Sequence, residues 1–77
     1  MIQELETVVL TRTFEQYGLQ EGDIGAVVHC YADGRTFEVE FVTADGRTVA
    51  VATLGADDIR RMNENEILHA RTVTAVA

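Results

Sequence analysis

Residues 24–54 read IGAVVHCYADGRTFEVEFVTADGRTVAVATL and carry the strongest structural signal in the chain. Two Asp-Gly pairs, at 33–34 and 45–46, divide this stretch into three segments, and these residue types tolerate the positive φ values of tight hairpin turns. In the middle segment the apolar residues of 37–41 alternate with two glutamates, which is the pattern of a half-buried strand. The stretch therefore predicts a meander of three antiparallel strands.

Short elements flank this meander on both sides. Residues 4–11 predict a first strand, and the polar stretch 12–23 is too long for a hairpin loop, so we expect it to fold over one end of the barrel. After Gly55, Asp57 is expected to cap one helical turn that leads into a last strand at residues 59–62. This order predicts an all-β fold, a small SH3-like barrel of about five short antiparallel strands with one helical turn before the last strand.

The chain is expected to divide into an SH3-like β-barrel domain at residues 1–62 and a C-terminal tail at residues 63–77. With 77 residues in total, it is long enough for one compact domain. The tail pattern fits strand, helix or disorder, so two alternatives stay open. Residues 72–76 could pair with the edge of a neighbouring copy, or the terminus could fray.

Charge and composition limit the classes of partner. Thirteen acidic residues stand against six arginines and no lysine, which gives a net charge of −7. Nucleic acid is therefore disfavoured, because binding phosphates needs a basic face, whereas an acidic surface speeds association with a basic protein. The apolar share of 47% also indicates surface that association into a homo-oligomer would bury.

The same features bear on localisation. The chain has one cysteine, and it has no apolar run of the roughly 20 residues that span a membrane. Its start, MIQELETVVL, carries acidic residues where a signal peptide has positive charge. We expect a cytoplasmic protein without membrane contact.

The chain lacks the residue sets that catalysis and cofactor binding require. It has no serine, and His29 and Cys30 are adjacent on a predicted strand. They face opposite sides, so they cannot form a catalytic dyad or share a metal ion. Cys30 shares a face with Ile24, Ala26 and Val28 and is expected to be a small core residue. We expect no enzymatic activity, no cofactor and no metal site.

Four segments together carry a resemblance to a known family. They are LETVVL at 5–10, YGLQEGDIGAVV at 17–28, FEVEFV at 37–42 and DGRTVA at 45–50. Over about residues 4–61 the chain resembles the bacterial domain of unknown function 4926 family, whose members are small SH3-like barrel proteins.

The most specific part of the resemblance is a Gly-Leu-x-x-Gly-Asp-x-Gly pattern at residues 18–25. Gly22 frees the backbone to enter the barrel, and Gly25 is expected to let neighbouring backbone approach closely within a strand. The resemblance implies a fold and no catalytic residues.

Partner-binding residues are predicted on one acidic surface that also holds aromatic side chains. Glu38 and Glu40 share a face of one strand, and Glu21 and Asp23 are expected to extend the surface at the loop end. Aromatic anchors within a charged rim are typical of protein interfaces. The predicted residues are Phe14, Tyr31, Asp33, Glu38 and Glu40.

We therefore expect a protein-interaction module, either an antitoxin-like neutraliser or an accessory subunit, that binds a basic partner. Two alternatives remain. One is a nucleic-acid-associated SH3-like barrel, for which Arg35, Arg47, Arg60 and Arg61 would have to supply the basic stripe. The other is a self-assembling domain.

Overall fold

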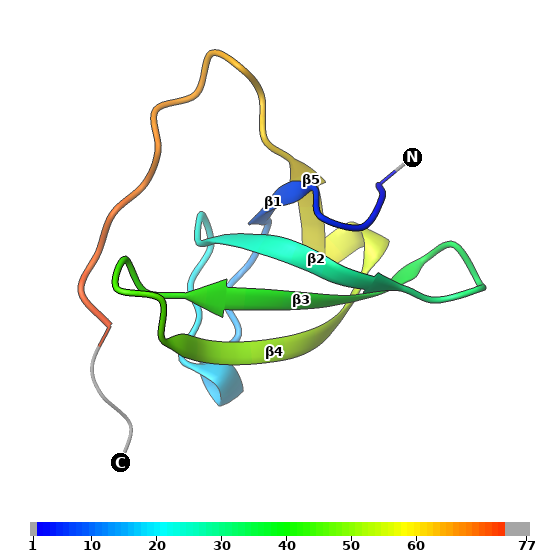
Figure 1. The fold of residues 1–77 in the computed structure, drawn as a ribbon, viewed down its shortest axis with the longest axis horizontal. Helices are drawn as coiled ribbons and strands as arrows, with labels where there is room; N and C mark the ends of the chain where they lie inside the picture. Colours follow the sequence, from blue (N-terminus) through cyan, green and yellow to red (C-terminus); the bar gives the residue numbers. More distant parts are fainter. Residues whose placement is uncertain (1, 74–77) are drawn as a thin grey trace.

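The computed structural model describes residues 2–73, and its fold is one curled antiparallel sheet. The strands have the spatial order β4-β3-β2-β1-β5, so β4 and β5 form the two edges (Figure 1). The elements are β1 (Thr7–Leu10), η1 (Glu15–Tyr17), β2 (Ile24–Cys30), β3 (Thr36–Val42), β4 (Thr48–Gly55), η2 (Ala56–Asp58) and β5 (Ile59–Arg61). The predicted all-β class, the five antiparallel strands and the helical turn before the last strand are confirmed.

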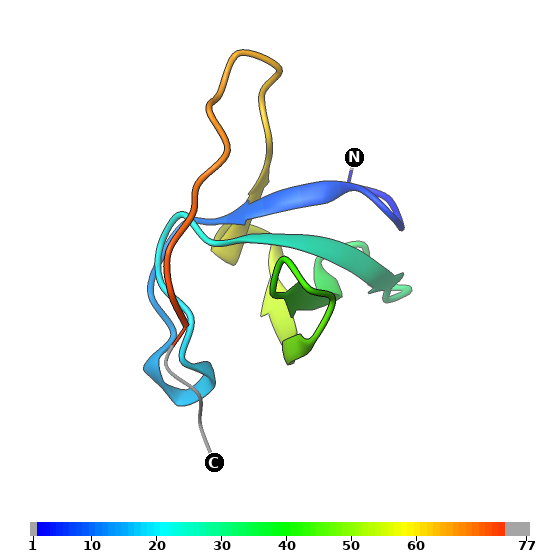
Figure 2. The ribbon, with the colours of Figure 1, turned by 60° about the vertical axis from the view of Figure 1, so that its left-hand side comes forward.

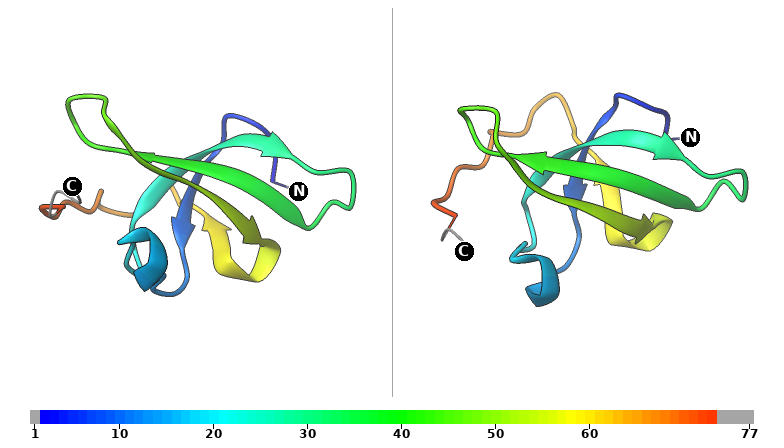
Figure 3. Two further views of the ribbon diagram at one scale, coloured as in Figure 1. Left: turned by 90° about the horizontal axis from the view of Figure 1, so that it is seen from below. Right: turned by 60° about the horizontal axis from the view of Figure 1, so that its bottom comes forward.

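The sheet curls around a core of side chains from every strand. The most deeply buried large ones are Val8, Val27, Val39, Leu10 and Leu54. Figures 2 and 3 show the short strands β1 and β5 crossing the long strands β3 and β4 at a steep angle, which closes the structure around this core. No helix among the described residues is long and apolar enough to cross a membrane.

The first strand is shorter than predicted because residues 3–6 form a turn. The amide of Glu6 donates to the carbonyl of Gln3 at 3.2 Å, and Leu5 has a φ of +71°. The Leu5 amide still reaches the carbonyl of Val27, at 2.7 Å. The turn therefore docks on β2 without continuing β1.

Two details of the core differ from expectation. In β2 it is Gly25 and Val27 that face inward, and Ala26 and Val28 are exposed. A β-bulge between Val27 and His29 then shifts the register, which brings Cys30 opposite Phe37 at the margin of the core. Cys30 is thus packed against the core as expected, but the shared face that led to the expectation is wrong.

Gly25 is needed for close packing of side chains and not of backbone. A Cβ atom at this position would lie 2.7 Å from atoms of both Phe41 and Val39 on β3. Gly22 has a φ of +93°, as its predicted role in the turn requires.

The cap of η2 is also different from the prediction. The Gly55 amide donates to a carboxylate oxygen of Asp58 at 2.9 Å, so Asp58 closes the turn and Asp57 does not. Asp58 stands three residues after Gly55, the spacing at which a side chain reaches back to the start of a helical turn.

Candidate functional site

The outward side of β3 and β4, together with the residue that follows β2, carries two neighbouring hydrogen-bonded groups of polar side chains, which we name the acidic face. Its members are Tyr31, Glu38, Glu40, Thr48 and Thr53. Antiparallel pairing places Glu38 opposite Thr53, and Glu40 opposite Val51, on the edge strand β4. Alternation along β3 points both glutamates away from the core, into which Phe37, Val39 and Phe41 project.

Glu38 is the centre of the acidic face. One of its carboxylate oxygens accepts hydrogen bonds from the hydroxyl of Thr53 at 2.5 Å and from that of Tyr31 at 2.7 Å. These two bonds, Thr53 first, hold the pKa of the Glu38 carboxyl below its usual value, and the Glu38 carboxylate raises the pKa of Tyr31. Glu38 is therefore fixed in position and stays ionised at neutral pH.

Glu40 is held in a similar way, since it accepts a hydrogen bond from the Thr48 hydroxyl at 2.7 Å. Within residues 2–73 no arginine forms an ion pair with Glu38 or Glu40. Five arginines pair instead with acids elsewhere in that part of the chain: Arg12 with Asp58, Arg47 with Asp45, Arg60 with Glu66, Arg61 with Glu6 and Arg71 with Asp23. The two half-buried glutamates therefore point outward without a guanidinium partner among residues 2–73.

Aromatic and aliphatic side chains border these carboxylates. The rings of His29 and Tyr31 meet edge to face with their centroids 4.7 Å apart. Tyr31, Val42 and Val51 are each 41–52% exposed. The face thus combines charge with accessible apolar area, as protein interfaces do.

Of the predicted site residues, Tyr31, Glu38 and Glu40 come together and the other two do not. Asp33 lies in the β2–β3 turn, where its carboxylate accepts the amide hydrogens of Arg35 and Thr36 at 2.8 and 2.9 Å. The Thr36 hydroxyl also donates to this carboxylate, and this bond first, followed by the two amide bonds, lowers the pKa of Asp33. Asp33 therefore stabilises the turn beside the face.

The prediction that Phe14 is a surface anchor is wrong, because its side chain is only 6% exposed and belongs to the core. It closes the long loop by backbone pairing with Leu19, and the guanidinium of Arg12 covers its ring at 4.0 Å. The polar stretch 12–23 holds two aromatic residues, Phe14 and Tyr17, and has no periodicity that would show which ring points inward.

Asp23 was also expected on the acidic surface, and it is buried instead, with 7% of its area exposed. The guanidinium of Arg71 in the tail donates hydrogen bonds to both carboxylate oxygens of Asp23, at 2.8 and 2.6 Å. The Gln20 amide also donates to the Asp23 carboxylate, at 2.8 Å. Burial alone would raise the pKa of Asp23, but these hydrogen bonds outweigh burial and hold the pKa below its ordinary value of 3.8. Asp23 therefore anchors the tail to the body of the domain.

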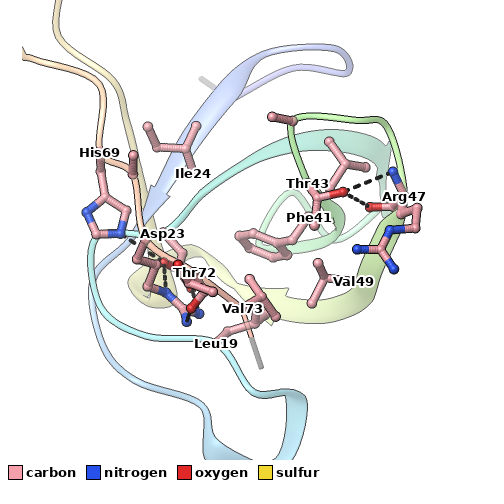
Figure 4. A pocket seen from close by; sticks show the side chains of 14 residues that line it. Leu19, Asp23, Ile24, Phe41, Thr43, Arg47, Val49, His69, Thr72 and Val73 are labelled. Atoms are coloured by element: carbon pink, nitrogen blue, oxygen red, sulfur yellow. Dashed lines mark hydrogen bonds and ion pairs between the residues drawn. The ribbon is translucent and has the colours of Figure 1, made fainter. Parts of the chain in front are cut away.

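The docked tail borders a groove that sequence reasoning missed. The tail groove has a volume of about 650 Å³ and lies between tail residues 69–73 and the β3–β4 hairpin. Figure 4 shows Asp23, His69 and Thr72 along one wall, with Phe41 and Val49 along the other. Its lining is mostly apolar, and Arg71 is already engaged with Asp23 and with the Gly18 carbonyl at 3.0 Å.

The tail itself forms no strand in the described residues 62–73. It folds back onto the loop before β2 of its own chain through Arg71 and through His69, whose Nε2 lies 3.2 Å from Asp23. The predicted pairing of residues 72–76 with a neighbouring copy falls largely on residues 74–76, which lie outside the described residues.

Comparison with known proteins places the chain in a family without adding an activity. No curated protein and no solved structure matches it. Over residues 4–61, which include all five strands, the sequence matches the model of the family described as Domain of unknown function (DUF4926). The chain therefore belongs to this family, as its sequence motifs predicted.

Proposed function

We propose that this chain is a non-catalytic protein-interaction module whose acidic face binds a basic partner protein. The observation that carries the proposal is the pair Glu38 and Glu40, both fixed by hydroxyl hydrogen bonds and both without an arginine partner in the described chain. Preorganised charges of one sign favour association with a surface of the opposite sign and speed the encounter. A lone cysteine suits a reducing compartment, which supports a cytoplasmic setting.

Matched charge-reversal variants test the proposal. In the face variant, Glu38→Lys and Glu40→Lys reverse two charges on the acidic face. In the control variant, Glu15→Lys and Glu64→Lys change the net charge equally at two exposed sites away from it. Each protein is used to capture partners from a lysate of the source cells at low and high salt, and the bound proteins are identified and quantified by mass spectrometry.

The expected result is a basic partner that binds the wild type and the control, loses affinity as salt rises, and binds the face variant at least about tenfold more weakly. Equal weakening in both variants would show that only net charge matters. A partner retained by the face variant, with its fold verified by circular dichroism, would also reject the proposal.

A further inference from the structure

One edge of the sheet is unusually open to another strand. β4 has eight residues, TVAVATLG, without a charge or a proline, and it pairs only with β3 in the described chain. The opposite edge, β5, has three residues, two of which are arginines. Proteins protect sheet edges by shortness, charge or proline, so β5 is protected and β4 is not.

The hydrogen-bonding pattern identifies which peptide groups of β4 are available. The Ala56 amide donates to the Arg35 carbonyl at 2.9 Å, and in an antiparallel ladder bonded and non-bonded pairs alternate. Leu54 and Ala52 are therefore bonded to β3, whereas the peptide groups of Thr53 and Val51 point away from it.

The end of the strand agrees with this alternation. The amide of Gly55, two residues after Thr53, points away from β3 and is taken by Asp58. The edge is thus closed at Gly55 and open at Thr53 and Val51, whose N–H and C=O groups face outward.

The carboxylates of the acidic face lie toward this same edge. The hydroxyls that hold Glu38 and Glu40 belong to Thr53 and Thr48, which are both β4 residues. A strand added beside β4 would lie two strand spacings, about 10 Å, from β3. Long basic side chains on that strand would extend over β4 and meet the glutamates.

We propose that β4 accepts an extended segment of the basic partner as an added antiparallel strand, with lysine or arginine at alternate positions over the acidic face. The inference rests on the proposed function and specifies its binding mode, in which main-chain hydrogen bonds supply affinity and alternate side chains supply specificity. A second copy of this chain fits less well, because it would bring another net charge of −7 to the edge.

The geometry of an added strand makes the test sharp. Residues directly opposite each other have side chains on the same face, so the lysines of the added strand lie opposite Val51 and Thr53. Because the peptide groups of Val51 and Thr53 point outward, these are hydrogen-bonded pairs, and the lysines direct their own backbone amides at β4. The probe is a synthetic peptide in which lysine alternates with valine. Two derivatives carry backbone N-methyl groups, one on the lysines and one on the valines.

The protein is tested with Val51→Pro, which removes one outward amide and leaves the bonds to β3 intact, and with Val51→Ala as its matched control. Proline is tolerated at an edge position whose amide faces solvent. Binding is measured by fluorescence anisotropy. The N-methylated peptides test the same contact on wild-type protein, so the result does not depend on whether the proline variant folds.

We expect the peptide with backbone N-methyl groups on its valines to bind like the unmethylated peptide. The peptide with backbone N-methyl groups on its lysines should bind at least about tenfold more weakly. Val51→Pro should weaken binding by about threefold to tenfold, which corresponds to the loss of one hydrogen bond, while Val51→Ala changes it less than twofold. Equal binding of the two methylated peptides would overturn the proposal.

The arms also separate this inference from the proposed function. If Glu38→Lys with Glu40→Lys abolishes binding while methylation has no effect, the acidic face binds basic partners without strand addition. If none of these changes matters, both proposals fail. Self-association of the wild type that Val51→Pro abolishes would assign the edge to a second copy and overturn the basic occupant.

Discussion

Replacing Arg71 with alanine should release the tail from the rest of the domain at a measurable cost in stability. The change removes two hydrogen bonds to Asp23, at 2.8 and 2.6 Å, and one to the Gly18 carbonyl at 3.0 Å. Asp23, which is 7% exposed in the folded chain, loses the guanidinium that pairs with its carboxylate. Breaking a fully buried pair costs about 3–5 kcal/mol. The Arg71 side chain is 19% exposed, so water screens part of the interaction, and we expect a loss of about 2 kcal/mol.

Urea unfolding followed by circular dichroism measures this loss. With the slope of a small domain, about 1–2 kcal/mol per molar urea, the midpoint should fall by roughly 1–2 M. Arg47→Ala is the control, because Arg47 forms an ion pair with Asp45 but its side chain is 76% exposed, and it should change stability by less than about 0.5 kcal/mol.

A double-mutant cycle with Asp23→Asn assigns the loss to the pair. If Arg71→Ala shifts the midpoint no more than Arg47→Ala does, or if the Asp23 and Arg71 effects simply add, the tail is not held by this contact.

Three further results are expected. The pKa of Asp23 is lower in the folded chain than its ordinary value of 3.8, so the ionised carboxylate stabilises the fold above that pH, and this stabilisation is lost as pH falls through the folded pKa. The difference in unfolding free energy between wild type and Arg71→Ala should therefore shrink in acid. A difference that grows in acid would contradict the pairing. Gly25→Ala places a Cβ atom 2.7 Å from two side chains of β3 and should destabilise by about 1–3 kcal/mol in urea titration, whereas an unchanged midpoint would mean that the core has room there. Tyr31→Phe removes a hydrogen bond to Glu38, so the pKa of the Glu38 carboxyl should rise in an NMR titration, while stability changes by less than about 0.5 kcal/mol. An unchanged pKa would show that the Tyr31 hydroxyl does not lower the pKa of Glu38.

Local pattern was sufficient to predict the meander and the order of the elements. The Asp-Gly pairs and the alternation of Phe37, Val39 and Phe41 are signals of neighbouring residues, and these three side chains are buried as predicted. The grouping of Cys30 with Ala26 and Val28 on one face was wrong because a β-bulge between Val27 and His29 breaks the alternation. Alternation read from sequence assumes an unbroken period of two and cannot detect such an insertion.

The site was predicted only where it depends on one strand. Glu38 and Glu40 point the same way because they are two residues apart on β3, which sequence shows directly. The partner of Asp23 is Arg71, which lies 48 residues away in a tail without periodicity, so no local pattern connects the two residues. The open edge of β4 likewise depends on strand order, which is a property of the whole sheet.

The most direct test of the central claim is an NMR map of where the alternating lysine–valine peptide binds. Isotope-labelled protein is titrated with the peptide, and changes in amide chemical shift are placed on the structure. The largest changes are expected on the acidic face and its edge, at Tyr31, Glu38, Glu40, Val51 and Thr53. They should vanish in the Glu38→Lys, Glu40→Lys variant. Changes centred on the tail groove would contradict the central claim.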